Sequence, residues 1–195
     1  MKLRFFGASI QWRVIYALAA SLLWWALVEL NQFWLGDTWS YPFYGTGAVY
    51  AALVLVPYLP DLRGMRLLRA LALLLCGALS YWMAVVFLGS EWLPMPDFMK
   101  SMGDGIWFAY SMGIAGILGA VIVGIGARLF VPLALRWSGW LMVSGAGLLG
   151  GVALGLGVNA GISAGGHISY EHWLPGHVAW QVLVCLALYY GSEHE

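Results

Sequence analysis

The sequence predicts an all-α integral membrane protein, a compact bundle of six transmembrane helices with both termini in the cytoplasm. Charged residues make up 9% of the chain and hydrophobic residues 62%, whereas an average soluble domain holds roughly 25% charged residues. So little polar surface could not cover a water-soluble fold. Six long apolar stretches follow one another, and the cationic residues fall almost entirely on one side of them. Composition, apolar runs and charge placement therefore agree on a membrane fold.

The six spans are identified by length, because a helix needs about 20 mostly apolar residues to cross a bilayer. The second is the weakest, since it is short and Pro57 and Pro60 interrupt its inner end. The first is expected to be an uncleaved span rather than a signal peptide. No linker separates the spans, so residues 1–195 are predicted to form a single polytopic transmembrane domain. The spans are Val14–Leu35, Gly45–Leu59, Leu67–Gly89, Gly105–Ala127, Ser138–Val158 and Trp173–Tyr190.

The orientation follows from the placement of the cationic residues. Only Lys100 falls in a connection on the outer side. Cationic residues near span ends are retained in the cytoplasm, so both termini are expected there; in a bacterial cell this is the inner membrane. Aromatic belts at both predicted interfaces support the span assignment. The eight cationic residues on the inner side are Lys2, Arg4, Arg13, Arg63, Arg66, Arg69, Arg128 and Arg136.

Glycines and one alanine recur every four residues in the fourth and fifth spans, and residues at this spacing share one helix face. Small residues on such a face let two helix backbones approach closely in lipid. A short inner connection joins these spans, so they are expected to pack as antiparallel neighbours. The alternative is a seam with a second copy of the chain or with a partner in a membrane complex. The residues are Gly116, Ala120 and Gly124, and Gly147, Gly151 and Gly155.

Polar side chains near the outer ends of the first, fifth and sixth spans predict a ligand-binding pocket. Glu29 lies six residues before the end of the first span, Asn159 ends the fifth, and His177 and Gln181 share a face of the sixth. Polar groups at membrane depth are costly, so each needs a partner or a task. Trp180 adds the aromatic wall that is typical of small-molecule pockets. A hydrogen bond that fixes the packing of the first and sixth spans is the alternative.

A second polar cluster precedes the sixth span on the predicted outer side. His167 and Glu171 are four residues apart and would share a helix face, and His172 follows directly. Imidazole and carboxylate groups are suitable ligands for zinc and other divalent metals. The inverted zinc-protease motif H-x-x-E-H has one residue fewer between its first histidine and its glutamate. A solvated loop is the alternative to a metal site.

These features leave three functional hypotheses. The first is a small-solute binding or transport protein with an outward-facing pocket. The second is a metal-dependent membrane enzyme that uses the outer histidine cluster, and the third is an accessory subunit of a larger membrane complex. Nucleic-acid binding is not expected, because no basic stripe could neutralise a phosphate backbone.

Overall fold

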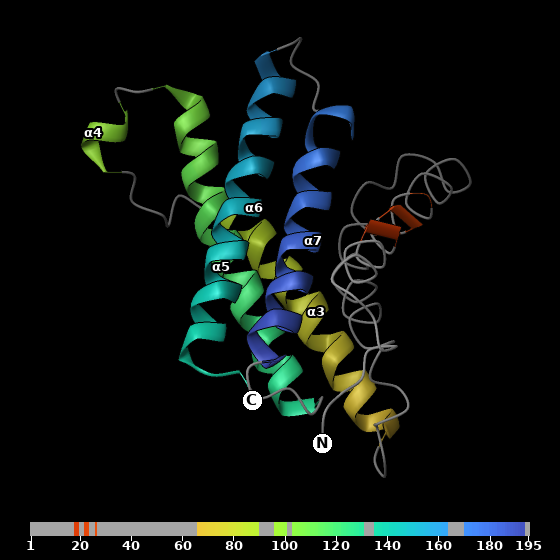
Figure 1. The fold of residues 1–195 in the computed structure, drawn as a ribbon. Helices are drawn as coiled ribbons and strands as arrows, with labels where there is room; N and C mark the ends of the chain where they lie inside the picture. The colour runs from red at the N-terminus through yellow and green to blue at the C-terminus, as the bar shows by residue number, and fades with distance from the viewer. Residues whose placement is uncertain are drawn as a thin grey trace.

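The computed structural model of the protein describes residues 66–89, 96–100, 103–130, 135–163 and 170–193, together with five helical positions between residues 18 and 26. All regular secondary structure in this part of the chain is helical, and it contains no strand. The second predicted span and nearly all of the first fall outside it. The elements are α3 (Arg66–Gly89), α4 (Asp97–Lys100), α5 (Asp104–Phe130), α6 (Trp137–Ser163) and α7 (Tyr170–Glu193), as shown in Figure 1.

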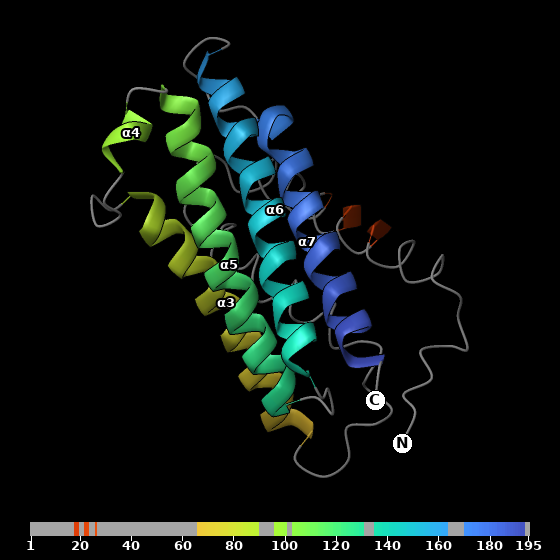
Figure 2. The same cartoon turned by 60° about the vertical axis from the view of Figure 1, so that its left-hand side comes forward.

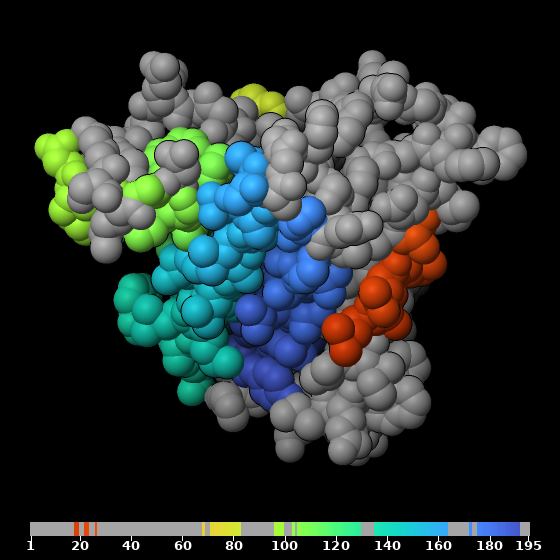
Figure 3. All heavy atoms as spheres, turned by 90° about the horizontal axis from the view of Figure 1, so that it is seen from above, coloured from red at the N-terminus to blue at the C-terminus, as the bar shows by residue number. Residues whose placement is uncertain are grey.

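The four long helices lie side by side in one bundle (Figure 2). Helix α3 packs against α5, α5 against α6, and α6 against α7, whereas α5 and α7 touch only sparingly. Helix α6 therefore stands between α5 and α7. Seen from above, α6 and α7 are neighbours, and α4 stands at the rim beside α5 (Figure 3).

Helix α5 is preceded by a glycine whose backbone conformation other residues rarely adopt. Gly103 has a φ of 94°, in the left-handed region that glycine enters at no steric cost. The amide of Ile106 donates to the carbonyl oxygen of Gly103 at 3.2 Å, which starts the first turn. At the other end, Arg128 lies in the last turn, where a cation interacts favourably with the helix dipole.

Two of the described helices, Gly105–Leu129 and Trp137–Ser163, have the length and apolar composition to cross a membrane. Large apolar side chains also line the outward faces of α3 and α6, which is typical of a surface in contact with lipid rather than water. The described part thus agrees with the predicted helical membrane class, and the complete six-span bundle stays a prediction. The exposed side chains are Leu68, Leu71, Leu75, Leu79 and Trp82 on α3, and Leu141, Met142, Leu148, Leu149 and Leu156 on α6.

The glycine faces of α5 and α6 pack directly against each other, as the four-residue spacing predicts. A β-carbon added to Gly116 would overlap the carbonyl oxygen of Gly147, and one added to Gly151 would overlap that of Met112. A β-carbon on Gly147 would lie 2.7 Å from that of Ala120. The two backbones are therefore in contact, which confirms tight packing within the chain. Association with a second copy or a partner stays a prediction.

A second glycine interface, between α6 and α7, has no counterpart in the sequence-based prediction. A β-carbon on Gly139 would lie 2.9 Å from the carbonyl oxygen of Gly191, and one on Gly150 would lie 2.7 Å from the β-carbon of Trp180. Gly176 brings α7 equally close to the backbone of α6, because its β-carbon would lie 2.6 Å from the amide nitrogen of Leu154. Helix α6 is thus in close contact with α5 on one side and with α7 on another.

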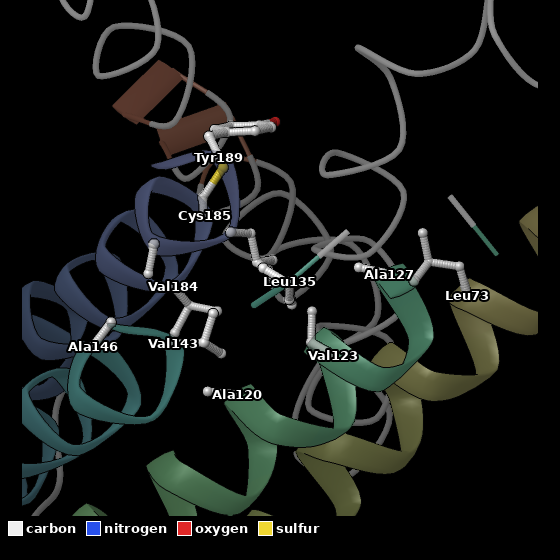
Figure 4. Packing of buried hydrophobic residues seen from close by; sticks show 12 residues of the cluster. Leu73, Ala120, Val123, Ala127, Leu135, Val143, Ala146, Val184, Cys185 and Tyr189 are labelled. Atoms are coloured by element: carbon white, nitrogen blue, oxygen red, sulfur yellow. The ribbon is translucent and has the colours of Figure 1, made fainter. Parts of the chain in front are cut away.

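The main apolar core lies where α5, α6 and α7 meet and includes Leu73 of α3. Figure 4 shows the small side chains of Ala120 and Val123 facing Val143. Tyr189 is only 3% exposed and belongs to this core. Its aromatic ring therefore packs inside the chain.

Candidate functional site

A cavity of about 40 Å³ lies among all four long helices. A water molecule needs roughly 10–15 Å³ of such space, so the cavity has room for a few waters or one very small solute. Each helix contributes at least two residues to its wall. The lining consists of Ser80 and Tyr81 from α3, Met112, Ala115, Gly116 and Gly119 from α5, Gly151 and Leu154 from α6, and His177 and Trp180 from α7.

The lining residues lie at one level of the bundle. Tyr81, Gly116, Gly151 and Trp180 each stand about 14 residues from the lower end of their helix in Figure 1, which is roughly 20 Å at 1.5 Å per residue. The helices run alternately up and down, so this agreement comes from four different positions along the chain. The cavity therefore lies at a single depth in the bundle, where all four long helices border it.

Trp180 forms one wall of the cavity and joins α7 to α5. Its indole N–H donates a hydrogen bond to the carbonyl oxygen of Gly116 at 3.3 Å. Gly119 makes room for the ring, because a β-carbon at this position would lie 3.2 Å from the indole and 3.6 Å from the carbonyl oxygen of Ser80. Gly119 is therefore the point where α3, α5 and α7 approach one another around the cavity.

His177 brings an imidazole group into the cavity wall. Its side chain is 3% exposed, and both ring nitrogens are shielded from solvent. The ring meets that of Tyr81 edge to face, with centroids 5.4 Å apart and an interplanar angle of 61°. This arrangement is a favourable one for two aromatic rings, and it fixes α7 against α3. Pro175, two residues earlier, lies inside α7 and removes one backbone donor from that turn.

The serine hydroxyl groups near the cavity are bonded to their own helices. The hydroxyl of Ser80 donates to the carbonyl oxygen of Gly77 at 2.8 Å, and that of Ser111 donates to the carbonyl oxygen of Phe108 at 3.2 Å. Such bonds to the preceding turn are the usual way for a helix to hold a buried serine. They make the hydroxyl groups compatible with an apolar surrounding.

The structure places the predicted ligand-binding residues as follows. His177 and Trp180 both line the cavity. Gln181, four residues after His177, is 1% exposed but does not contribute to the lining. Asn159 lies near the start of α5, with its amide nitrogen 2.7 Å from where a β-carbon on Gly105 would be. Glu29 lies outside the described residues, so its convergence with His177 stays a prediction.

The predicted metal ligands are described only in part. The ring of His172 lies against Gly161 at the end of α6, where an added β-carbon would be 3.2 Å from the ring carbon Cγ. His167 and the side chain of Glu171 lie outside the described residues. Within the described ranges, no group of three His, Cys, Asp or Glu side chains could hold a metal ion. The zinc site therefore stays a prediction.

Sequence reasoning missed the contributions of α3 and of Gly119 to the cavity. Ser80 and Tyr81 form a polar pair in the middle of a span that is apolar from Ala70 onward, and this signal could have drawn attention to them. Gly119 does not belong to the four-residue repeat of small residues in its span, so no sequence pattern pointed to it. No protein-family model, curated protein or solved structure matches this chain.

Proposed function

We propose that the chain is a six-span protein of the inner membrane, with both termini cytoplasmic, that binds or transports a small solute. The solute occupies the cavity beside His177 and Trp180. Glu29 and Asn159 complete the pocket on its outward-facing side, and Gln181 lies next to Trp180 on its inner side. This function is the first of the three hypotheses that the sequence leaves open.

The observation that carries the proposal is the cavity with a buried imidazole in its wall. Helices in lipid pack closely when small residues meet, as α5 and α6 do through Gly116 and Gly151. At this same level the four helices nevertheless leave space, and His177 and Tyr81 border it. Concave sites with mostly apolar walls and a few polar groups are the usual form of small-molecule sites.

The experiment is a thermal-unfolding screen of the full chain in detergent with a panel of small solutes. The panel contains inorganic ions, amines, amides, alcohols, amino acids and sugars. A solute that binds the folded state raises the unfolding temperature as its concentration exceeds its dissociation constant. We expect at least one class to stabilise the wild-type protein.

Two glycine variants connect any stabilisation to the cavity. Gly119→Ala adds a methyl group 3.2 Å from Trp180, whereas Gly145→Ala adds one where no atom lies within 4 Å. The stabilising solute should act on wild type and Gly145→Ala and lose its effect on Gly119→Ala. Equal stabilisation of all three proteins, or none by any solute, contradicts the proposal.

A further inference from the structure

The wall of the cavity offers very little polar surface to a guest. Among the described lining residues, Met112, Ala115 and Leu154 contribute aliphatic atoms, and the surface that faces the space is almost wholly apolar. The hydroxyl group of Ser80 donates to the carbonyl oxygen of Gly77 in its own helix. A water molecule inside a protein needs about two to four polar partners, so water gains little by entering this space.

The polar atoms of two ring side chains in the wall are also engaged or shielded. The indole N–H of Trp180 donates to the carbonyl oxygen of Gly116 at 3.3 Å. Both ring nitrogens of His177 are shielded from solvent, and its ring packs edge to face against that of Tyr81. These rings therefore present mainly carbon atoms to the space.

The helices cannot close the space by moving together, because their backbones already touch beside it. A β-carbon on Gly151 would overlap the carbonyl oxygen of Met112. Gly119 and the indole of Trp180 are likewise in contact, since a β-carbon on this glycine would lie 3.2 Å from the ring. Atoms that border a void lose dispersion contacts on that side. A polarisable apolar guest would restore those contacts.

We infer that the cavity is an apolar binding site, which takes a small uncharged molecule, or the short alkyl group of one, without a hydrogen bond to the wall. The inference rests on the proposed function and adds the substrate class. Apolar cavities in proteins stay dry and bind apolar guests such as xenon. Among the solutes of the thermal screen, those with a short alkyl group should therefore stabilise the chain, and inorganic ions and sugars should not.

Xenon, added under pressure to the full chain in nanodiscs, is the probe for this site. Carbon-13 NMR of the methionine methyl groups reports where it binds, since Met112 lines the cavity and is 6% exposed, whereas Met142 is 42% exposed on the outward face of α6. Met112→Leu and Met142→Leu assign the two signals. We expect the Met112 signal to shift to a plateau as the xenon pressure rises. The Met142 signal should shift only in proportion to the xenon dissolved in the lipid.

Variants that fill the cavity connect the plateau to the site. Ala115 is 2% exposed and lines the cavity, so Ala115→Val adds two carbon atoms to the wall and should weaken xenon binding about tenfold. Ala160→Val makes the same change at an exposed position of α6 and should match wild type. Ser80→Thr adds one methyl group from α3 and keeps the hydroxyl group, so it repeats the test if Ala115→Val fails to fold.

A Met112 shift that reaches no plateau, or a plateau that survives in both filling variants, overturns the inference. Stabilisation by an ion or a sugar that Gly119→Ala abolishes overturns it as well, and solute binding itself then survives. A thermal screen in which no solute acts removes the proposed function instead. A xenon plateau that the filling variants abolish would still support the apolar site in that case.

Discussion

The indole nitrogen of Trp180 lies 3.3 Å from the carbonyl oxygen of Gly116 and donates a hydrogen bond to it. The bond connects α7 to α5, two helices that otherwise touch sparingly because α6 stands between them. Residues 64 positions apart in the chain thereby meet at the wall of the cavity. The same contact holds a ring that lines the cavity.

Loss of this hydrogen bond should be measurable as a loss of stability. Trp180→Phe removes the N–H donor and leaves the Gly116 carbonyl with its helical partner alone. We expect the free energy of unfolding in detergent to fall by about 1–2 kcal/mol. Trp137→Phe is the matched control, since Trp137 is 77% exposed and should change stability by less than about 0.5 kcal/mol. Equal losses in the two variants would show that the hydrogen bond contributes nothing.

The glycine contact between α5 and α6 predicts a position-specific effect of a single methyl group. In Gly151→Ala, the added carbon would overlap the carbonyl oxygen of Met112, so the helices must separate. The expected loss is about 1–3 kcal/mol in the free energy of unfolding. Gly145→Ala lies on the same helix with open space around it and should lose nothing. Unfolding in a denaturing detergent measures both; a similar loss at both positions would rule out the packing described here.

The approach of α7 to the end of α6 can be tested by a disulfide. A β-carbon on Gly161 would lie 3.1 Å from that of His172, close to the separation of roughly 3.5–4.5 Å found in disulfides. Gly161→Cys with His172→Cys, in a chain whose free Cys76 and Cys185 are replaced by alanine, should therefore oxidise. Non-reducing electrophoresis reports the product. The pair Gly145→Cys with His172→Cys should stay reduced, and its oxidation would mean that random collisions suffice.

The charge distribution predicts a topology that reporter fusions can check. Fusions after Gly64, after Leu133 and after Glu195 should place the reporter in the cytoplasm, because cationic connections stay inside. A fusion after Ser101 should place it outside. Green fluorescent protein reports the cytoplasmic side and alkaline phosphatase the outer side. Phosphatase activity after Glu195 would reverse the predicted orientation.

The sequence alone predicted most of the described helices. Apolar length predicted spans at Leu67–Gly89 and Gly105–Ala127, and α3 and α5 begin within one residue of these starts. Helix α6 continues five residues beyond the predicted end at Val158, because Asn159 looked like a polar boundary but lies packed against Gly105. Helix α7 begins at Tyr170, three residues before the predicted start at Trp173, for a related reason. Hydropathy detects the lipid-exposed part of a helix and misses turns that are covered by other helices.

Only part of the cavity wall could be predicted from the sequence. The spacing of His177 and Gln181 indicated a buried polar face on one helix, and both side chains are buried. The participation of α3 was not foreseen, because it depends on which helices meet at one level of the bundle. The contact of α6 with α7 was missed because Gly139 and Gly150 are separated by three turns, with larger residues between them. Periodicity within one span carries no information on such pairings.

The three glycines in the cavity wall change how a mutational survey of this protein should be interpreted. At Gly116, Gly119 and Gly151, every substitution adds atoms, so a defect there reports crowding of a helix contact or of the cavity rather than a missing contact. An alanine scan is interpreted on the assumption that alanine removes a side chain. Effects at these three glycines would therefore be misinterpreted as lost contacts. Substitution at any of the three positions can only increase the side-chain volume there. Any enlargement of the cavity would have to come from substitution of the larger neighbours, with Trp180 the first of them.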